Sequence, residues 1–152
     1  MEPQLRILTS EERSPELLDA LLALWRASVA ATHTFLTPAE IEAIAPQAKA
    51  GLEGIETLVV LQADGQPAGF IGVQDRKIEM LFLHPTYFRR GWGKLLVQHA
   101  FDALAVKWVD VNEQNPQARH FYEHMGFVVV RRDALDSEGR TYPILAMERK
   151  AS

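Results

Sequence analysis

The chain has 152 residues, of which 47% are hydrophobic and 24% are charged, and this composition is typical of one compact α/β domain spanning residues 1–152. The formal net charge of -4 disfavours general binding to nucleic acid or to an anionic membrane. Cysteine is absent, which excludes disulfides, thiolate metal sites and a cysteine nucleophile.

The first predicted elements are a strand and a helix. Residues 4–8 are read as a short strand. Ser14 is followed by Pro15 and Glu16, which is the order of an N-cap, a first-turn proline and a first-turn acid. Apolar side chains then recur at intervals of three and four, which predicts an amphipathic helix that buries Leu18, Leu21, Leu22, Trp25 and Val29.

A second helix is predicted to begin at a capping box. In the segment 37–40, Thr-Pro-Ala-Glu, the Thr hydroxyl and the Glu carboxylate each accept an N–H that the helix leaves unpaired. This helix should end near Gly51 or Gly54. Residues 57–63 and 68–74 then flank an Asp-Gly dipeptide suited to a tight turn, and we expect them to form a hairpin.

The middle of the chain combines a strand, a loop and a helix. Residues 78–83 are apolar enough for a central strand, Glu79 is the one acid in it, and Pro85 ends it. The helix after the loop is expected to bury Leu96, Ala100, Ala103 and Leu104.

The last part of the chain predicts a strand, a helix and a closing pair of strands. Residues 108–111 are the strand, and Asn115 and Pro116 repeat the cap and first-turn proline of a helix that stops at Gly126. A terminal antiparallel pair is expected at 127–131 and 142–148. The whole order predicts a mixed sheet with helices on both faces.

Two glycines stand between the central strand and its helix. In the segment 88–94, Phe-Arg-Arg-Gly-Trp-Gly-Lys, the glycines allow a sharp turn that points successive N–H groups and a helix N-terminus at one spot, which suits phosphate oxygens. A plain glycine turn with exposed arginines is the alternative interpretation. Rossmann and Walker patterns do not fit, because Leu96 replaces a third glycine and Leu95 replaces the Ser or Thr that follows a Walker lysine.

The segment 115–127 has the form Asn-x-x-Ala-x-x-Phe-Tyr-x-x-x-Gly-Phe. Together with the glycine loop, it resembles the GNAT superfamily of acyl-CoA-dependent N-acyltransferases. Further segments are similar to the YjaB-type bacterial branch, namely WRASVAATHTFL at 25–36, VNEQN at 111–115 and the Tyr-Pro pair at 142–143. The resemblance implies an α/β (α+β) fold whose mixed, mostly antiparallel sheet has six to seven strands.

The resemblance also implies a function. It predicts an N-acetyltransferase that moves an acetyl group from acetyl-CoA to a primary amine, either a protein lysine or a small amine, by direct attack in a ternary complex without a metal. A non-catalytic acyl-CoA-binding sensor is the alternative, and a domain that binds another nucleotide is a further one. Glu79 and Tyr122 favour the enzyme, whereas Phe88 stands where the superfamily has Arg or Gln and leaves room for the sensor.

A CoA site is implied along the loop, the strand and the later helix. The pyrophosphate would be held by Gly91 and Gly93 together with the backbone of Arg89, Arg90, Trp92 and Lys94, and the side chain of Arg89 or Arg90 would supply the charge that Phe88 lacks. The pantetheine arm would pair with the strand end formed by Leu81, Phe82 and Leu83. Asn115 is similar to an asparagine near the CoA arm, and Tyr122 to a tyrosine whose hydroxyl lies beside the thioester sulfur.

Glu79 and Tyr122 are the predicted catalytic residues. A lysine-like amine with a pKa of about 10.4 is protonated at neutral pH, so its attack on a thioester needs a base. Glu79 would take that proton directly or through a water, and Tyr122 would donate to the departing sulfur. An outward-facing or salt-bridged carboxylate is the alternative for Glu79.

The acceptor pocket is expected to be lined by Trp25, His33, Phe35 and Tyr142. A helix-terminal histidine satisfied by local hydrogen bonds is the alternative for His33. His120 and His124 have the spacing of one metal-binding helix face, but without an evident third ligand we expect a solvated surface there. With neither a signal-like start nor a long apolar run in the sequence, we expect a cytoplasmic protein. The sequence leaves both a monomer and a homodimer open.

Overall fold

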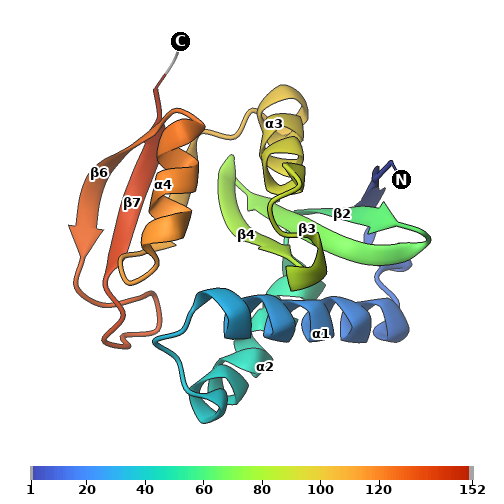
Figure 1. Cartoon of the computed structure of the whole chain (residues 1–152), viewed down its shortest axis with the longest axis horizontal. Coiled ribbons are helices and arrows are strands. Elements are labelled where there is room, and N and C mark those ends of the chain that lie inside the picture. Colours follow the sequence, from blue (N-terminus) through green and yellow to red (C-terminus); the bar gives the residue numbers. More distant parts are fainter. Residues whose placement is uncertain (1, 151–152) are drawn as a thin grey trace.

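The computed structural model describes residues 2–150, which form seven strands, four α-helices and two short 3-10 helices (Figure 1). The strands are β1 (Gln4–Leu8), β2 (Thr57–Ala63), β3 (Gln66–Gln74), β4 (Lys77–Leu83), β5 (Trp108–Asn112), β6 (Phe127–Asp133) and β7 (Ile144–Arg149). The helices are α1 (Pro15–Thr32), α2 (Pro38–Gly54), α3 (Trp92–Leu104) and α4 (Pro116–His124), with 3-10 turns η1 (Ser10–Glu12) and η2 (Pro85–Tyr87). The predicted element order is confirmed.

Three of the four α-helices begin at the predicted side-chain caps. Ser14 accepts the N–H of Leu17, and Asn115 accepts the N–H of Ala118, both at 3.2 Å. Thr37 and Glu40 form the capping box of α2. Helix α3 differs because its N-cap, Gly91, makes no side-chain cap hydrogen bond.

The seven strands form one sheet in the order β1-β2-β3-β4-β5-β7-β6. Every neighbouring pair is antiparallel except β4 and β5, which confirms the expected mixed, mostly antiparallel sheet. Parallel pairing between β4 and β5 joins only Lys77 to Trp108 and Ile78 to Val109. Among residues 2–150, the edge of β4 beyond Ile78 therefore has no strand partner on the β5 side.

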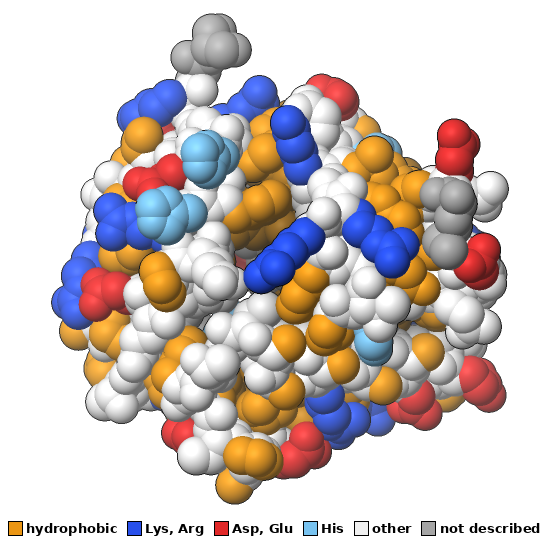
Figure 2. Space-filling view, viewed as in Figure 1, with side chains coloured by type: hydrophobic (Ala, Val, Ile, Leu, Met, Phe, Trp, Pro, Cys, Tyr) orange, Lys and Arg blue, Asp and Glu red, His pale blue; other side chains and the backbone are white. Residues whose placement is uncertain are grey.

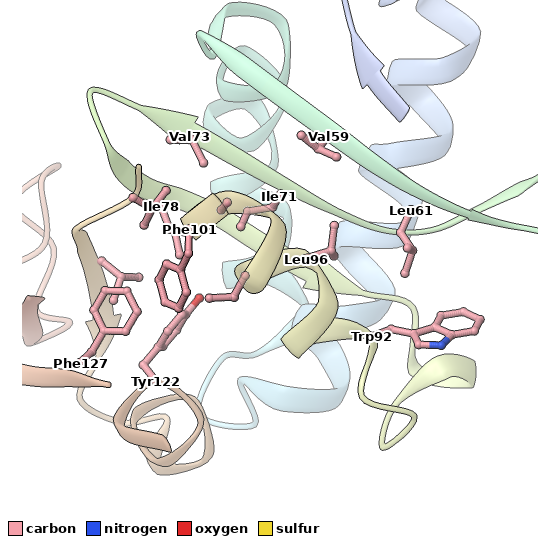
Figure 3. Packing of buried hydrophobic residues seen from close by; sticks show 14 of the residues in the cluster. Val59, Leu61, Ile71, Val73, Ile78, Trp92, Leu96, Phe101, Tyr122 and Phe127 are labelled. Carbon is pink, nitrogen blue, oxygen red and sulfur yellow. The ribbon is translucent and has the colours of Figure 1, made fainter. Parts of the chain in front are cut away.

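Helices cover both faces of the sheet, as expected. Alternate residues of β2 face opposite sides: Val59 and Leu61 pack with α3 and α4, whereas Leu58 and Val60 pack with α1 and α2. Figure 3 shows the first of these clusters, with Phe101 of α3 beside Phe127 of β6. Among residues 2–150, no helix is long and apolar enough to cross a membrane.

Two details of the expected elements were wrong. Ala103 is exposed, because the buried stripe of α3 is centred on Leu96, Val97, Ala100 and Phe101. The last strand begins at Ile144 rather than Tyr142, because both of its partner strands end at residues that pair with Ile144. Tyr142 instead belongs to the connection between β6 and β7.

Adjacent leucines in α3 test the packing of this core. Leu96 is fully buried and Leu95 is 41% exposed. Replacing Leu96 by Ala leaves a cavity and should lower the free energy of unfolding by about 3 kcal/mol. The control Leu95→Ala should change it by less than about 0.5 kcal/mol, and urea unfolding of both variants measures the difference. Equal losses would contradict the burial described here.

Candidate functional site

A cleft of about 810 Å³ lies where β4 and β5 part. Its walls come from both strands, the C-terminal end of α1, the loop before α3, the first turn of α3 and one side of α4. Figure 2 shows this face of the molecule hollowed between α4 and the loop before α3, with Lys and Arg side chains beside the hollow. The predicted CoA-site residues are thus brought together, with one exception given below.

The cleft begins at a β-bulge in β4. Val73 pairs with Ile78 and Gly72 pairs with Met80, so Glu79 is the extra residue of the bulged strand. The bulge resets the alternation of the strand, since Ile78 and Leu81 pack toward α3 while Met80 packs toward α1 and α2. Glu79 consequently stands at the start of the unpaired edge and lines the cleft.

The carboxylate of Glu79 shares one cation with a neighbouring acid. Lys77 Nζ lies 2.5 Å from Asp110 Oδ2 and 3.9 Å from Glu79 Oε1. Partial burial raises the pKa of Glu79, Lys77 opposes this shift, and the negative charges of Asp110 and Asp75 add to it. Glu79 is therefore a partly solvated carboxylate, 42% exposed, with a loose ion pair, which suits it to accept a proton.

The N-terminus of α3 supplies free N–H groups to the opposite part of the cleft. Gly91 has a φ of 78° and Arg89 a φ of 64°, so the chain turns sharply just before the helix. Without a side-chain cap, the first N–H groups of α3 are available to a bound anion. A Cβ on Gly93 would lie 3.5 Å from Leu83 and 3.6 Å from Phe121, so glycine keeps the cleft open at this point.

The cations of this loop divide between two environments. Arg89 and Lys94 line the cleft. Arg90 does not: its guanidinium lies over the rings of Tyr87 and Trp92, at 5.3 and 5.7 Å, and these two rings stack at 4.9 Å. Phe88, which occupies the position of the usual Arg or Gln, also lines the cleft.

Tyr122 projects from α4 into the protein interior. It is 6% exposed, lines the cleft and packs edge-on against Phe121 and Phe127. Figure 3 shows the Tyr122 ring among the buried residues of this cluster. Burial raises the pKa of Tyr122, so the hydroxyl keeps its proton and can donate it to a ligand. Asn115, the buried cap of α4, lines the same cleft.

A second cavity of about 660 Å³ lies between α1, α2 and the connection from β6 to β7. It contains all four residues predicted for the acceptor pocket, Trp25, His33, Phe35 and Tyr142. The Phe35 ring lies 5.5 Å from His33 and 6.1 Å from Tyr142. The Tyr142 hydroxyl donates to Glu40 at 2.7 Å, and Arg140 donates to Gln47 at 2.9 Å, which ties the connection to α2.

The two cavities meet at the β4 bulge. Five residues line both of them: His33, Glu79, Met80, Phe82 and Asn112. The sequence interpretation did not single out Asn112, although its place at the end of β5, within the VNEQN segment, was a usable signal. Molecules bound in the two cavities would therefore come together beside Glu79 and His33.

The histidine pair on α4 does not form a metal site. The side chain of His120 is 76% exposed and lies 4.0 Å from Glu123. His124 lines the cleft. Within residues 2–150, no group of three or more His, Asp or Glu side chains is arranged to hold a metal ion.

Known proteins are similar to this chain in sequence and in fold. Residues 24–148 match the family model described as an acetyltransferase (GNAT) domain. The chain is 36% identical over 127 residues to the peptidyl-lysine N-acetyltransferase YjaB of Salmonella typhimurium, and the match covers 84% of this chain and 88% of the relative. The solution structure of apo-form YjaB from Escherichia coli has a TM-score of 0.85 and 32% identity, with 100% of both chains covered.

A more distant structure has the same fold. The crystal structure of the PaiA N-acetyltransferase from Thermoplasma acidophilum, in complex with coenzyme A, has a TM-score of 0.74 and 22% identity. The superposition covers 99% of this chain and 100% of that one.

The electrostatics of Glu79 predict opposite effects of two substitutions. Lys77→Met removes the cation that lowers the pKa of Glu79, so this pKa should rise. Asp110→Asn removes a repelling anion and frees Lys77, so the pKa should fall. Carboxyl ¹³C NMR titration measures both, with Lys107→Met, whose ammonium pairs with Glu148, as the control without a shift. Two shifts in the same direction would contradict this arrangement of charges.

Proposed function

This chain belongs to the GNAT acetyltransferase family, and on that premise we propose that it moves the acetyl group of acetyl-CoA onto the side-chain amine of a lysine in a protein or peptide. The family, the similarity to YjaB and the acetyltransferase activity predicted from the sequence are confirmed. The name of the relative with 36% identity, a peptidyl-lysine N-acetyltransferase, supports the lysine acceptor. The CoA complex of the PaiA structure supports the donor.

One observation carries the assignment of the donor to the cleft: an unpaired strand edge, an uncapped helix N-terminus and a buried phenol line the same space. The N–H groups of Trp92, Gly93 and Lys94 would bind the pyrophosphate, and the side chains of Arg89 and Lys94 would add positive charge. Arg90 would act mainly through its backbone, because its side chain lies on Tyr87 and Trp92.

The pantetheine arm would lie along β4. The edge formed by Leu81, Phe82 and Leu83 has free backbone groups on the β5 side among the described residues, and an extended chain can pair with such an edge. The arm would end near Tyr122, with Asn115 beside it. This placement leaves the thioester at the junction of the two cavities.

The acceptor would enter through the second cavity. Its aromatic wall of Trp25, Phe35 and Tyr142 suits the aliphatic stem of a lysine, and the Glu79 carboxylate would attract the ammonium group. Proton removal toward Glu79 would free the nitrogen lone pair to attack the thioester carbon. Tyr122, which holds its proton firmly, would donate a hydrogen bond to the sulfur as the carbon–sulfur bond breaks.

We also propose that residues 1–152 act as a single domain, which the continuous sheet from β1 to β7 supports. The cytoplasmic location and the choice between monomer and homodimer stay predictions.

Release of free thiol tests the function. With acetyl-CoA and a lysine-containing peptide, the protein should release CoA thiol in step with acetylation of the peptide, measured by a thiol reagent and by mass spectrometry. Tight binding of acetyl-CoA without thiol release, over a panel of lysine peptides and small amines, would instead identify a sensor. Thiol release with small amines alone would contradict the lysine acceptor.

Ligand-induced stabilisation tests the donor site. CoA at 100 times its dissociation constant should stabilise the protein by about 2.7 kcal/mol, measured by thermal unfolding. ATP at the same concentration should have a much smaller effect, because it lacks the pantetheine arm that would pair with β4. Equal stabilisation by the two ligands would indicate a general nucleotide site.

Tyr122→Phe separates catalysis from binding. The variant should lose kcat by about 100-fold, because the donor to the leaving sulfur is gone, while the CoA dissociation constant changes little. Tyr87→Phe is the matched control, since Tyr87 stacks on Trp92 outside the cleft lining. Steady-state kinetics and calorimetry measure the two effects, and an unchanged kcat would remove Tyr122 from the mechanism.

A further inference from the structure

A short hydrogen-bond chain ends at His33, the C-cap of α1. Thr32 Oγ1 donates to the backbone oxygen of Ser28, one turn earlier, at 2.8 Å. The hydroxyl oxygen of Thr32 also lies 2.8 Å from His33 Nδ1. A hydroxyl has one hydrogen, and Ser28 receives it, so toward His33 the hydroxyl oxygen is an acceptor.

This chain selects the tautomer of His33. Because the Thr32 hydroxyl accepts, Nδ1 of the imidazole must carry the hydrogen. In the neutral ring, Nε2 then has the free lone pair. Burial lowers the pKa of His33, which keeps the ring neutral near pH 7 and its lone pair available.

His33 lies where the two cavities meet, so its lone pair would be close to a bound acceptor. His33 and Glu79 are the titratable residues among the five that line both cavities. Other ionisable groups line one cavity each: Asp110 from β5 and Tyr122 from α4 line the first, and Asp136, Arg140 and Tyr142 from the connection between β6 and β7 line the second. Asp136 is already paired with Arg140, and Asp110 with Lys77.

We propose that Nε2 of His33 receives the proton of the acceptor ammonium, and that the Glu79 carboxylate stabilises the imidazolium formed. The proposal rests on the proposed function and deepens it: the atom that takes the proton is His33 Nε2 rather than the Glu79 carboxylate, and Glu79 acts through its negative charge. An imidazole is a better matched base at neutral pH than a carboxylate, because its pKa lies nearer the working pH. Thr32 is then a positioning residue that holds the ring in the required tautomer.

The proton and electron balance is complete. One ammonium proton moves to Nε2 and from there to solvent, and the nitrogen lone pair forms the bond to the acetyl carbon. The carbon–sulfur bond then breaks, its electron pair stays on sulfur, and the second nitrogen proton is lost as the thiol forms with help from the Tyr122 hydroxyl. The products are an acetamide, a thiol and one proton released to solvent.

Substitution of His33 tests the proposed base. His33→Gln should lower kcat/KM for a lysine peptide by about 100-fold with little change in CoA affinity. The loss should be much smaller for an acceptor amine of low pKa, which is already unprotonated at pH 7.5. Added imidazole should restore part of the activity of His33→Ala. Full activity of His33→Gln would overturn the inference alone, whereas a wild-type chain without acetyl transfer would overturn the proposed function.

Thr32 provides a matched pair of variants. Thr32→Ser keeps the hydroxyl and should keep the activity, while Thr32→Val keeps the shape and should lose about 10-fold in kcat/KM. Side-chain ¹⁵N NMR of the wild-type protein reads the tautomer directly. Hydrogen on Nδ1 in the wild type and in Thr32→Ser, and a shift toward Nε2 in Thr32→Val, supports the inference. Hydrogen on Nε2 in the wild-type protein would overturn it, whatever the fate of the variants.

Discussion

The separation of β4 from β5 is the constraint on which the site depends. The two strands pair at two positions only, while β5 continues in register with β7 along its whole length. The bulge at Glu79 falls directly after the last paired residue of β4, so the strand changes direction where its partner is lost. An open backbone edge is costly to bury without a ligand, and here it borders both cavities.

Partial burial at the junction gives the site its chemistry. It raises the pKa of Glu79 and lowers that of His33, so the two groups come closer in proton affinity than they are in water. Tyr122, buried on the opposite side of the cleft, is shifted so that it keeps its proton. A proton acceptor on one side and a proton donor on the other are the two groups that acyl transfer from a thioester to an ammonium requires.

Local sequence signals predicted the elements well because their causes are local. The caps at Ser14, Thr37 and Asn115 and the turn at Asp64 each depend on a few neighbouring residues, and the structure contains all four. The glycine loop was found for the same reason, since the left-handed φ of Gly91 is a property of one residue.

Features that depend on distant partners were not predictable. The stretch from Ile78 to Leu83 reads as a regular strand, and only its register with β3 reveals the bulge at Glu79. The sequence left open whether the side chain of Arg89 or that of Arg90 faces the cleft, and only the stacked rings of Tyr87 and Trp92 show that the Arg90 guanidinium lies over them. The tautomer of His33 follows from where the Thr32 hydroxyl donates, which the sequence does not state.

Backbone NMR during a titration with CoA tests the donor site most directly. Saturable shifts in the amide signals should be largest at residues 79–83 and 91–94, with little change in β1 and β6, because the ligand would bind the open edge and the uncapped helix end. An absence of saturable shifts, or shifts concentrated outside the cleft, would contradict the proposal that this opening in the sheet receives the acyl donor.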